Sequence, residues 1–233
     1  MYGNYQLIIY KDNTQDDNEL NPKKDIERDY DIESTRRAKR TVLELALNNS
    51  FDWFVTFTFH TKGSLINDRK DFEDIKKKFL KSINNYNRLY DTKLDYIACP
   101  ELHANKQGVH FHCLMKGLNT TEDFTYVGKD SKTHRSRFRS KYFLERFGAN
   151  YGVRIFDYNK FVAFYVSKYI TKQDDRIFFR RFFRSNGLQK SFVIKRGLTT
   201  DYFEGVLVPS YESPLLKLYE FDDLDLLTKV ISL

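Results

Sequence analysis

Long apolar runs are absent from the sequence. No stretch approaches the length of a membrane span, and the first residues lack the charged and then apolar pattern of a signal peptide. Cysteine is also rare, and strand parity places the two cysteines, Cys99 and Cys113, on opposite faces of a sheet, which argues against a bridge between them. Buried free thiols in a reducing compartment are the expected state, so we predict a soluble intracellular protein.

Glycine, proline and methionine are scarce as well, with 10, 4 and 2 residues among 233. The chain has no internal repeat and no low-complexity linker, so no firm domain boundary can be drawn. Aromatic residues, in contrast, are abundant, with 21 Phe and 16 Tyr. A net charge of +7 and a pI near 9.1 favour a polyanionic partner.

The spacing of apolar residues predicts an α+β protein. Residues 11–33 indicate a loop or mobile arm, and the segment from Tyr211 is acidic. We therefore divide the chain into an N-terminal strand and arm (1–33), a main domain (34–200) and an acidic C-terminal extension (201–233) packed on the same domain. The expected helices begin at Ser34 or cover 68–90, 135–147 and 159–172; the expected strands cover 5–10, 51–60, 94–103, 108–116, 152–157 and 191–195.

The strand expected at 51–60 has two unlike faces. One is aromatic and belongs against helices. The other carries Thr56, Thr58 and His60, which line a substrate groove or are ordinary half-buried polar residues of a sheet.

Three of the five histidines lie in one short stretch, between residues 100 and 115. His110 and His112 flank Phe111, so on a strand both imidazoles point to one side, where they can bind a divalent metal. Glu101 and His103 share a face of the preceding strand. If Glu101 pairs near His112 and His103 near His110, all of them reach one ion. The alternative is a polar sheet face without a metal.

A second motif lies in the helix expected at 159–172, where Tyr-x-x-Lys occurs twice in tandem. Tyr165 and Tyr169 are four residues apart and therefore face the same way, with Lys168 and Lys172 beside them. A lysine ammonium favours the phenolate, and a metal-held phosphate is a good electrophile. These are the parts needed for phosphodiester transesterification onto tyrosine. The alternative is an amphipathic helix whose aromatic residues are only core.

Basic and aromatic residues are interleaved in two further segments, near 132–146 and 177–185. This pattern suits a surface that follows a nucleic-acid backbone and stacks bases, although the first segment equally suits an amphipathic helix with a buried aromatic side. The candidate DNA-binding residues are Arg135, Arg137, Arg139, Lys141, Arg180, Arg181 and Arg184.

Three ordered motifs together resemble the HUH rolling-circle replication initiators. They are the strand Phe54–Phe59, the His-apolar-His at 110–112 preceded by Glu101, and the segment Tyr165–Lys172. The doubled tyrosine resembles the two-tyrosine branch of single-stranded DNA phages and related plasmids. The segment Arg181–Leu188 is also similar to one that follows the tyrosine helix in phage members. The resemblance covers about residues 50–190.

The resemblance implies a mainly antiparallel sheet of ferredoxin- or RRM-like descent, with the tyrosine helix packed near the histidine strand. It implies that His110, His112 and Glu101, or His103 in its place, hold one Mg²⁺ or Mn²⁺ ion. One tyrosine would then nick single-stranded or hairpin origin DNA, leaving a 5′-phosphotyrosine and a free 3′-OH, and the strands would be rejoined when rolling-circle replication ends. Lys168 and Lys172 would stabilise the phenolate or the transition state.

The implied setting is the cytoplasm of a bacterial host. A host polymerase would extend the 3′-OH, and because no Walker-type phosphate loop is present, a host helicase is implied. Three alternatives stay open: a relaxase of the same superfamily, a transposase of the same superfamily, and a non-catalytic protein that binds single-stranded DNA.

Overall fold

The computed structural model describes residues 5–10, 22–60, 66, 69–156, 160–171, 180–190, 211–212 and 216–221. The chain forms two units: Met1–Pro22 together with Phe192–Leu233, and Lys23–Ser191. In the first unit, the strand expected at 5–10 is confirmed and pairs with a strand near the other end of the chain. This small antiparallel sheet has the order β1–β10–β9, with β1 at Tyr5–Tyr10, β9 at Tyr211–Glu212 and β10 at Leu216–Phe221.

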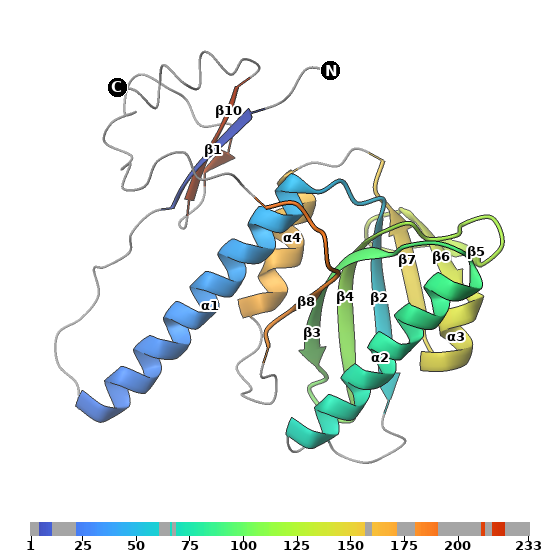
Figure 1. Cartoon of the computed structure of the whole chain (residues 1–233), viewed down its shortest axis with the longest axis horizontal. Helices are drawn as coiled ribbons and strands as arrows, with labels where there is room; N and C mark the ends of the chain where they lie inside the picture. The colour runs from blue at the N-terminus through green and yellow to red at the C-terminus, as the bar shows by residue number, and fades with distance from the viewer. Residues whose placement is uncertain are drawn as a thin grey trace. The chain divides into compact units, whose positions relative to one another are not determined.

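The second unit contains a seven-stranded antiparallel sheet in the order β5–β6–β7–β2–β4–β3–β8, flanked by four helices among the described residues (Figure 1). The α+β class is confirmed. None of the described helices has the length and apolar character needed to cross a membrane. The helices are α1 (Pro22–Asn48), α2 (Arg69–Leu89), α3 (Lys141–Phe147) and α4 (Lys160–Thr171). The strands are β2 (Trp53–His60), β3 (Asp95–Leu102), β4 (Gly108–Lys116), β5 (Phe124–Lys129), β6 (Ser136–Ser140), β7 (Asn150–Arg154) and β8 (Phe183–Arg184).

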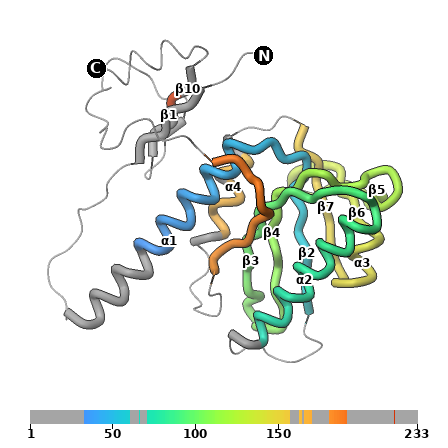
Figure 2. Tube along the Cα trace, viewed as in Figure 1, coloured from blue at the N-terminus to red at the C-terminus, as the bar shows by residue number. Residues whose placement is uncertain are grey.

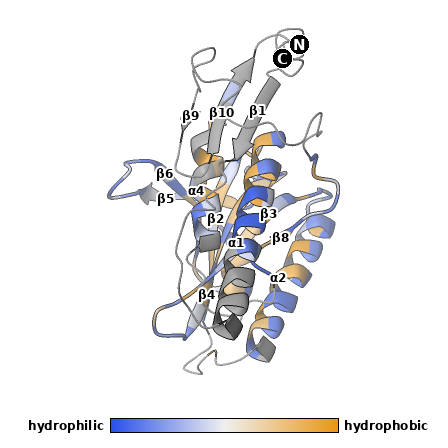
Figure 3. Cartoon of the chain, turned by 90° about the vertical axis from the view of Figure 1, so that its left-hand side faces the viewer, coloured by the Kyte–Doolittle hydropathy of each residue, from blue (hydrophilic) through white to orange (hydrophobic). Residues whose placement is uncertain are grey.

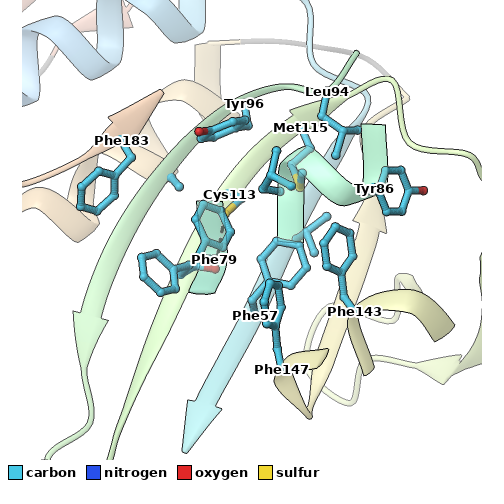
Figure 4. Packing of buried hydrophobic residues seen from close by; sticks show 14 of the residues in the cluster. Phe57, Phe79, Tyr86, Leu94, Tyr96, Cys113, Met115, Phe143, Phe147 and Phe183 are labelled. Carbon is cyan, nitrogen blue, oxygen red and sulfur yellow. Dashed lines mark hydrogen bonds between the residues drawn. The ribbon is translucent and has the colours of Figure 1, made fainter. Parts of the chain in front are cut away.

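One face of this sheet forms the hydrophobic core, because alternate residues of β2 and β4 point the same way. Phe57 and Phe111 are fully buried there and contact Phe79 of α2, whose ring stacks on Phe111 at a centroid distance of 4.7 Å (Figure 4). Helix α2 is amphipathic and shows both apolar and polar turns in Figure 3. The aromatic face of the strand predicted at 51–60 thus packs against helices, as expected.

Helix α3 closes the same core and begins where side chains satisfy its first backbone N–H groups. Ser140 Oγ accepts a hydrogen bond from the N–H of Phe143, and buried Asp123 accepts from the N–H of Tyr142. The helix ends at Gly148, whose φ of 97° suits glycine. Phe143, buried by this helix, contacts Phe57 across the core.

Two predicted helix boundaries are wrong. Helix α1 begins at Pro22 rather than Ser34, so the part of the expected arm from Pro22 onward is helical; proline suits the first helical turn. The helix expected at 135–147 begins only at Lys141, because Ser136–Ser140 forms strand β6. In that strand Phe138 contacts Trp53 on the core side, which is the alternation of a strand and not the period of a helix. Strands β5 and β8 were not predicted.

The other elements that can be compared agree closely with their predicted bounds. The strand expected at 191–195 lies outside the described residues. The proposed division at residues 33 and 200, and the packing of the C-terminal extension on the main domain, stay predictions.

Candidate active site

The second face of the sheet carries the histidine pair, and threonines of β2 orient it. His110 pairs with Thr58 and His112 with Thr56 in the antiparallel register. Nδ1 of His110 lies 3.0 Å from Thr58 Oγ1, and Nδ1 of His112 lies 3.3 Å from Thr56 Oγ1. When Nδ1–H donates to the threonine hydroxyl, the lone pair of each imidazole is on Nε2. The threonine face of β2 therefore positions the histidines.

The predicted register of the histidine hairpin is wrong by two residues. Glu101 pairs with His110 and not with His112, because the hairpin closes with His103 N–H bonded to the carbonyl of Gly108. Gly108 is required here, since a Cβ would collide with the Phe59 carbonyl and lie 2.8 Å from the His103 ring. A shift of two residues keeps every side chain on its expected face. The predicted contact survives diagonally, because Glu101 Oε2 lies 2.7 Å from His112 Nε2.

Four histidines, not three, gather along this edge of the site. The His103 ring lies 4.0 Å from that of His110 and 5.3 Å from that of His60, between ring centroids. Among the described residues, buried His103 Nε2 has no hydrogen-bond partner. Burial, and next the neighbouring His110, lowers the pKa of His103; burial, and next His112, lowers the pKa of His110. Both shifts favour the neutral imidazole that ligates metals.

His60 was not predicted as part of the histidine group. Its position on the threonine face of β2 was the available signal, but its approach to His103 depends on how the hairpin turns, which the sequence alone does not specify.

The donor set fits a divalent ion in chemistry, since imidazole nitrogens and a carboxylate suit Mn²⁺ and related metals. In this structure, however, Glu101 and His112 bond to each other. Within the described part of the chain, no three His, Cys, Asp or Glu side chains form a ready-made metal-binding group. Binding would therefore require the Glu101–His112 hydrogen bond to open, with both groups turning to the ion. Metal binding stays a prediction, as does the choice between Glu101 and His103.

Helix α4 brings both candidate tyrosines to the histidines, so the expected packing of this helix near the histidine strand is confirmed. The Tyr169 ring stacks on His112 at 3.7 Å between centroids, and its Oη donates a hydrogen bond to Tyr165 Oη at 2.9 Å. Tyr169 is 8% exposed, whereas Tyr165 is 49% exposed and contacts Phe54 edge-on. Burial, and then the bond to Tyr165, raises the pKa of Tyr169. Tyr165 is thus the phenol that a substrate can reach.

Of the two candidate lysines, Lys168 lies exposed on α4 beside the tyrosines, and Lys172 lies outside the described residues. A second ammonium group approaches from α1. The pKa of Lys39 is lowered mainly by burial and further by the charge of Lys168. Lys39 belongs to a basic run for which the sequence left a phosphate contact and a solvated surface both open.

The structure separates the predicted DNA-binding arginines into two groups at opposite ends of the sheet. Arg137 and Arg139 lie on β6, and Arg184 lies on β8, which runs along β3 (Figure 2). Because Arg137 pairs with Val153 and Arg184 with Ile97, both point to the histidine face. Arg135 is in the turn before β6, Lys141 is the first residue of α3, and Arg180 and Arg181 precede β8. DNA contact by these residues stays a prediction.

Comparison with known proteins identifies the relationship of the chain. The family model of replication-associated proteins of the ORF2/gene 2 protein type matches residues 52–174, more than half of the chain. The matched region runs from just before β2 to just past α4, and so contains the histidines, Glu101 and both tyrosines. No curated protein and no solved structure gives a significant match. The chain belongs to this family of replication-associated proteins.

Proposed function

We propose that this protein is a replication initiator of the HUH, two-tyrosine type that nicks single-stranded origin DNA by transesterification. The observation that carries the proposal is the stacking of Tyr169 on His112, with Tyr169 Oη bonded to Tyr165 Oη. Two phenols therefore lie directly against the histidine pair. A core helix without catalytic function would have no reason to leave Tyr165 half exposed at this position.

Tyr165 is the proposed nicking residue. Its Oη forms the new bond to the phosphorus of the scissile phosphate, the bond from phosphorus to the 3′ oxygen breaks, and that oxygen leaves as a 3′-OH. The phenol loses one proton and the 3′ oxygen gains one. The raised pKa of Tyr169 keeps its phenol neutral, so it can donate a hydrogen bond to Tyr165 during the attack. Lys168 would balance negative charge on the phosphate.

His110, His112 and Glu101 would hold a Mg²⁺ or Mn²⁺ ion, with His103 as an alternative ligand. When bound, such an ion polarises phosphate oxygens as a Lewis acid. Thr56 and Thr58 fix the ring orientation of the two histidines, which is the usual role of the outer partner of a histidine ligand. After one round of synthesis, Tyr169 is the candidate for the second attack, and the released 3′-OH would rejoin the strand. Host polymerase and helicase would be the partners.

Covalent capture tests the proposal. Single-stranded fragments that tile the DNA encoding the protein are incubated with the full chain and Mn²⁺, and the mixture is run on a denaturing gel. We expect a shifted band that EDTA and His112→Ala abolish and that Tyr165→Phe removes. The matched control is Tyr126→Phe, which alters an exposed phenol on strand β5.

Two results would redirect the assignment. An adduct that survives in Tyr165→Phe but not in Tyr169→Phe would make Tyr169 the nicking residue. No adduct with any fragment, together with tight DNA binding, would favour a binding protein without nuclease activity.

A further inference from the structure

Strand β7 received no functional role from the sequence, yet it presents a tyrosine on the histidine face. Tyr151 and His112 are both Cα partners of Thr56, from the two neighbours of β2, so the three side chains lie in one row. The next residue, Gly152, faces the core instead, where a Cβ would lie 3.2 Å from the Trp53 ring. This alternation fixes the direction of Tyr151.

Tyr151 also lies close to the candidate nucleophiles. It is one of the groups that contribute to the raised pKa of Tyr169. Helix α4 contacts β3 and β4, and its Tyr169 stacks on His112. The Tyr151 ring, two strands from His112, keeps 38% of its surface exposed. An exposed aromatic ring beside a reaction site is the kind of surface on which an unpaired base stacks.

Arginines continue the row away from the site. Arg137 pairs with Val153, two residues along β7 from Tyr151, and Arg139 follows at the same parity on β6. The Arg137 guanidinium lies 5.8 Å from the Tyr151 ring centroid, the outer limit of a cation–π contact. Among the described residues, its buried Nε has no hydrogen-bond partner. The sequences of β6 and β7 contain no acidic residue.

We propose that Tyr151 stacks a base of the single-stranded substrate next to the nicked phosphate, while Arg137 and Arg139 bind the phosphates that follow. The strand would run from the histidines across β2 and β7 to β6, a span of about 14 Å at the usual strand spacing. The proposal rests on the proposed function, because it states where the nicked strand continues. Paired bases cannot use this platform, since their faces are already stacked in a duplex.

Binding of an oligothymidylate of about 16 nucleotides tests the platform, since single-strand-binding grooves have site sizes up to about that length. Binding is measured in EDTA on the Tyr165→Phe, Tyr169→Phe background, so that nicking cannot contribute. We expect Tyr151→Ala to weaken binding by about 5- to 150-fold, the worth of one stacked base, and Tyr151→Trp to retain it. Arg137→Gln should reduce the slope of log affinity against log salt by about 0.7, one phosphate contact on a single strand.

Matched controls come from the opposite face of the same sheet. Tyr126 is an exposed tyrosine whose Cα partner is the core-facing Phe138, and Arg154 pairs with core-facing Trp53. We expect Tyr126→Ala and Arg154→Gln to bind like the background protein. Unchanged binding by Tyr151→Ala, or an equal loss in Tyr126→Ala, would overturn the platform. Loss of covalent capture with the Tyr151 dependence intact would instead overturn the proposed nicking and leave the platform standing.

Discussion

The two faces of the seven-stranded sheet are built from the same strands and have opposite compositions. On β4, Phe111 is fully buried among rings of the core face, while its neighbours His110 and His112 face Thr58 and Thr56 on the other. Alternation by one residue therefore separates the groups that stabilise the fold from the groups that can perform chemistry. Substitutions on the first face should change stability, and substitutions on the second should change metal or DNA binding.

The largest expected effect lies on the core face. Phe111→Ala should lower the free energy of unfolding by about 3–5 kcal/mol, because it removes a buried ring and leaves a cavity. That ring contacts Phe79 at 4.7 Å and Phe59 at 5.3 Å between centroids. The adjacent His110→Ala should cost only about 1 kcal/mol, the net worth of one hydrogen bond. Denaturant unfolding measures both.

If Phe111→Ala does not fold, Phe111→Leu supplies the measurable core variant, with an expected loss of less than about 1.5 kcal/mol if the site repacks. The comparison would fail if His110→Ala proved as destabilising as Phe111→Ala. That result would mean that the histidine face also carries the stability of the sheet.

Gly152 offers a second test on one strand. Its Cβ position is 3.2 Å from Trp53 and 3.3 Å from Phe124, so there is no room for a branched side chain. Gly152→Val should lower unfolding free energy by about 1–3 kcal/mol through overpacking. Tyr151→Phe, one residue away on the open face, should leave it unchanged. A tolerated valine would show that Trp53 can move and that the core face is loosely packed here.

Alternation could be predicted from the sequence because it is a local property. The faces of β2 and β4, the amphipathic α2 and the direction of both candidate tyrosines all follow from residue spacing. The register of the histidine hairpin could not, since it depends on the turn that Gly108 permits, and the two-residue error preserved the faces but not the pairing.

Non-local features escaped prediction for a related reason. Residues 136–140 have basic and aromatic residues that suit a helix as well as a strand, and only pairing with β5 and β7 decides between them. The approach of His60 to His103 and of Lys39 to Lys168 joins elements distant in the sequence. The sequence contained these residues but no information on their distances.

On the histidine face, Thr58→Val should change metal binding and leave the fold intact. The substitution keeps the shape of the side chain and removes the hydroxyl 3.0 Å from His110 Nδ1. Removing such a partner typically weakens metal affinity by about 10- to 100-fold, and we expect about tenfold. Titration of Mn²⁺ followed by electron paramagnetic resonance measures the affinity, with Thr125→Val on exposed β5 as control. Equal affinities would remove Thr58 from the site.

The smallest effect concerns alkaline pH and again separates the faces. A phenol whose pKa is raised by folding keeps its proton in the native state, so stability is complete below the unfolded pKa of about 10 and falls as pH rises above it. Tyr169 on the histidine face and Tyr96 in the core both have raised pKa values, that of Tyr96 reaching about 12. Each should contribute a loss of about 0.8 kcal/mol at about pH 10.5 relative to about pH 8.

Tyr169→Phe and Tyr96→Phe should each remove one such contribution, as measured by urea unfolding at the two pH values. The double variant should remove both, because the two sites share no contact and their effects should add. If Tyr169→Phe loses as much stability at high pH as the wild type, the Tyr169 phenol ionises as freely when folded as when unfolded. Its neutral role as hydrogen-bond donor to Tyr165 would then be untenable, and the order of the two tyrosines in the proposed reaction would have to be reversed.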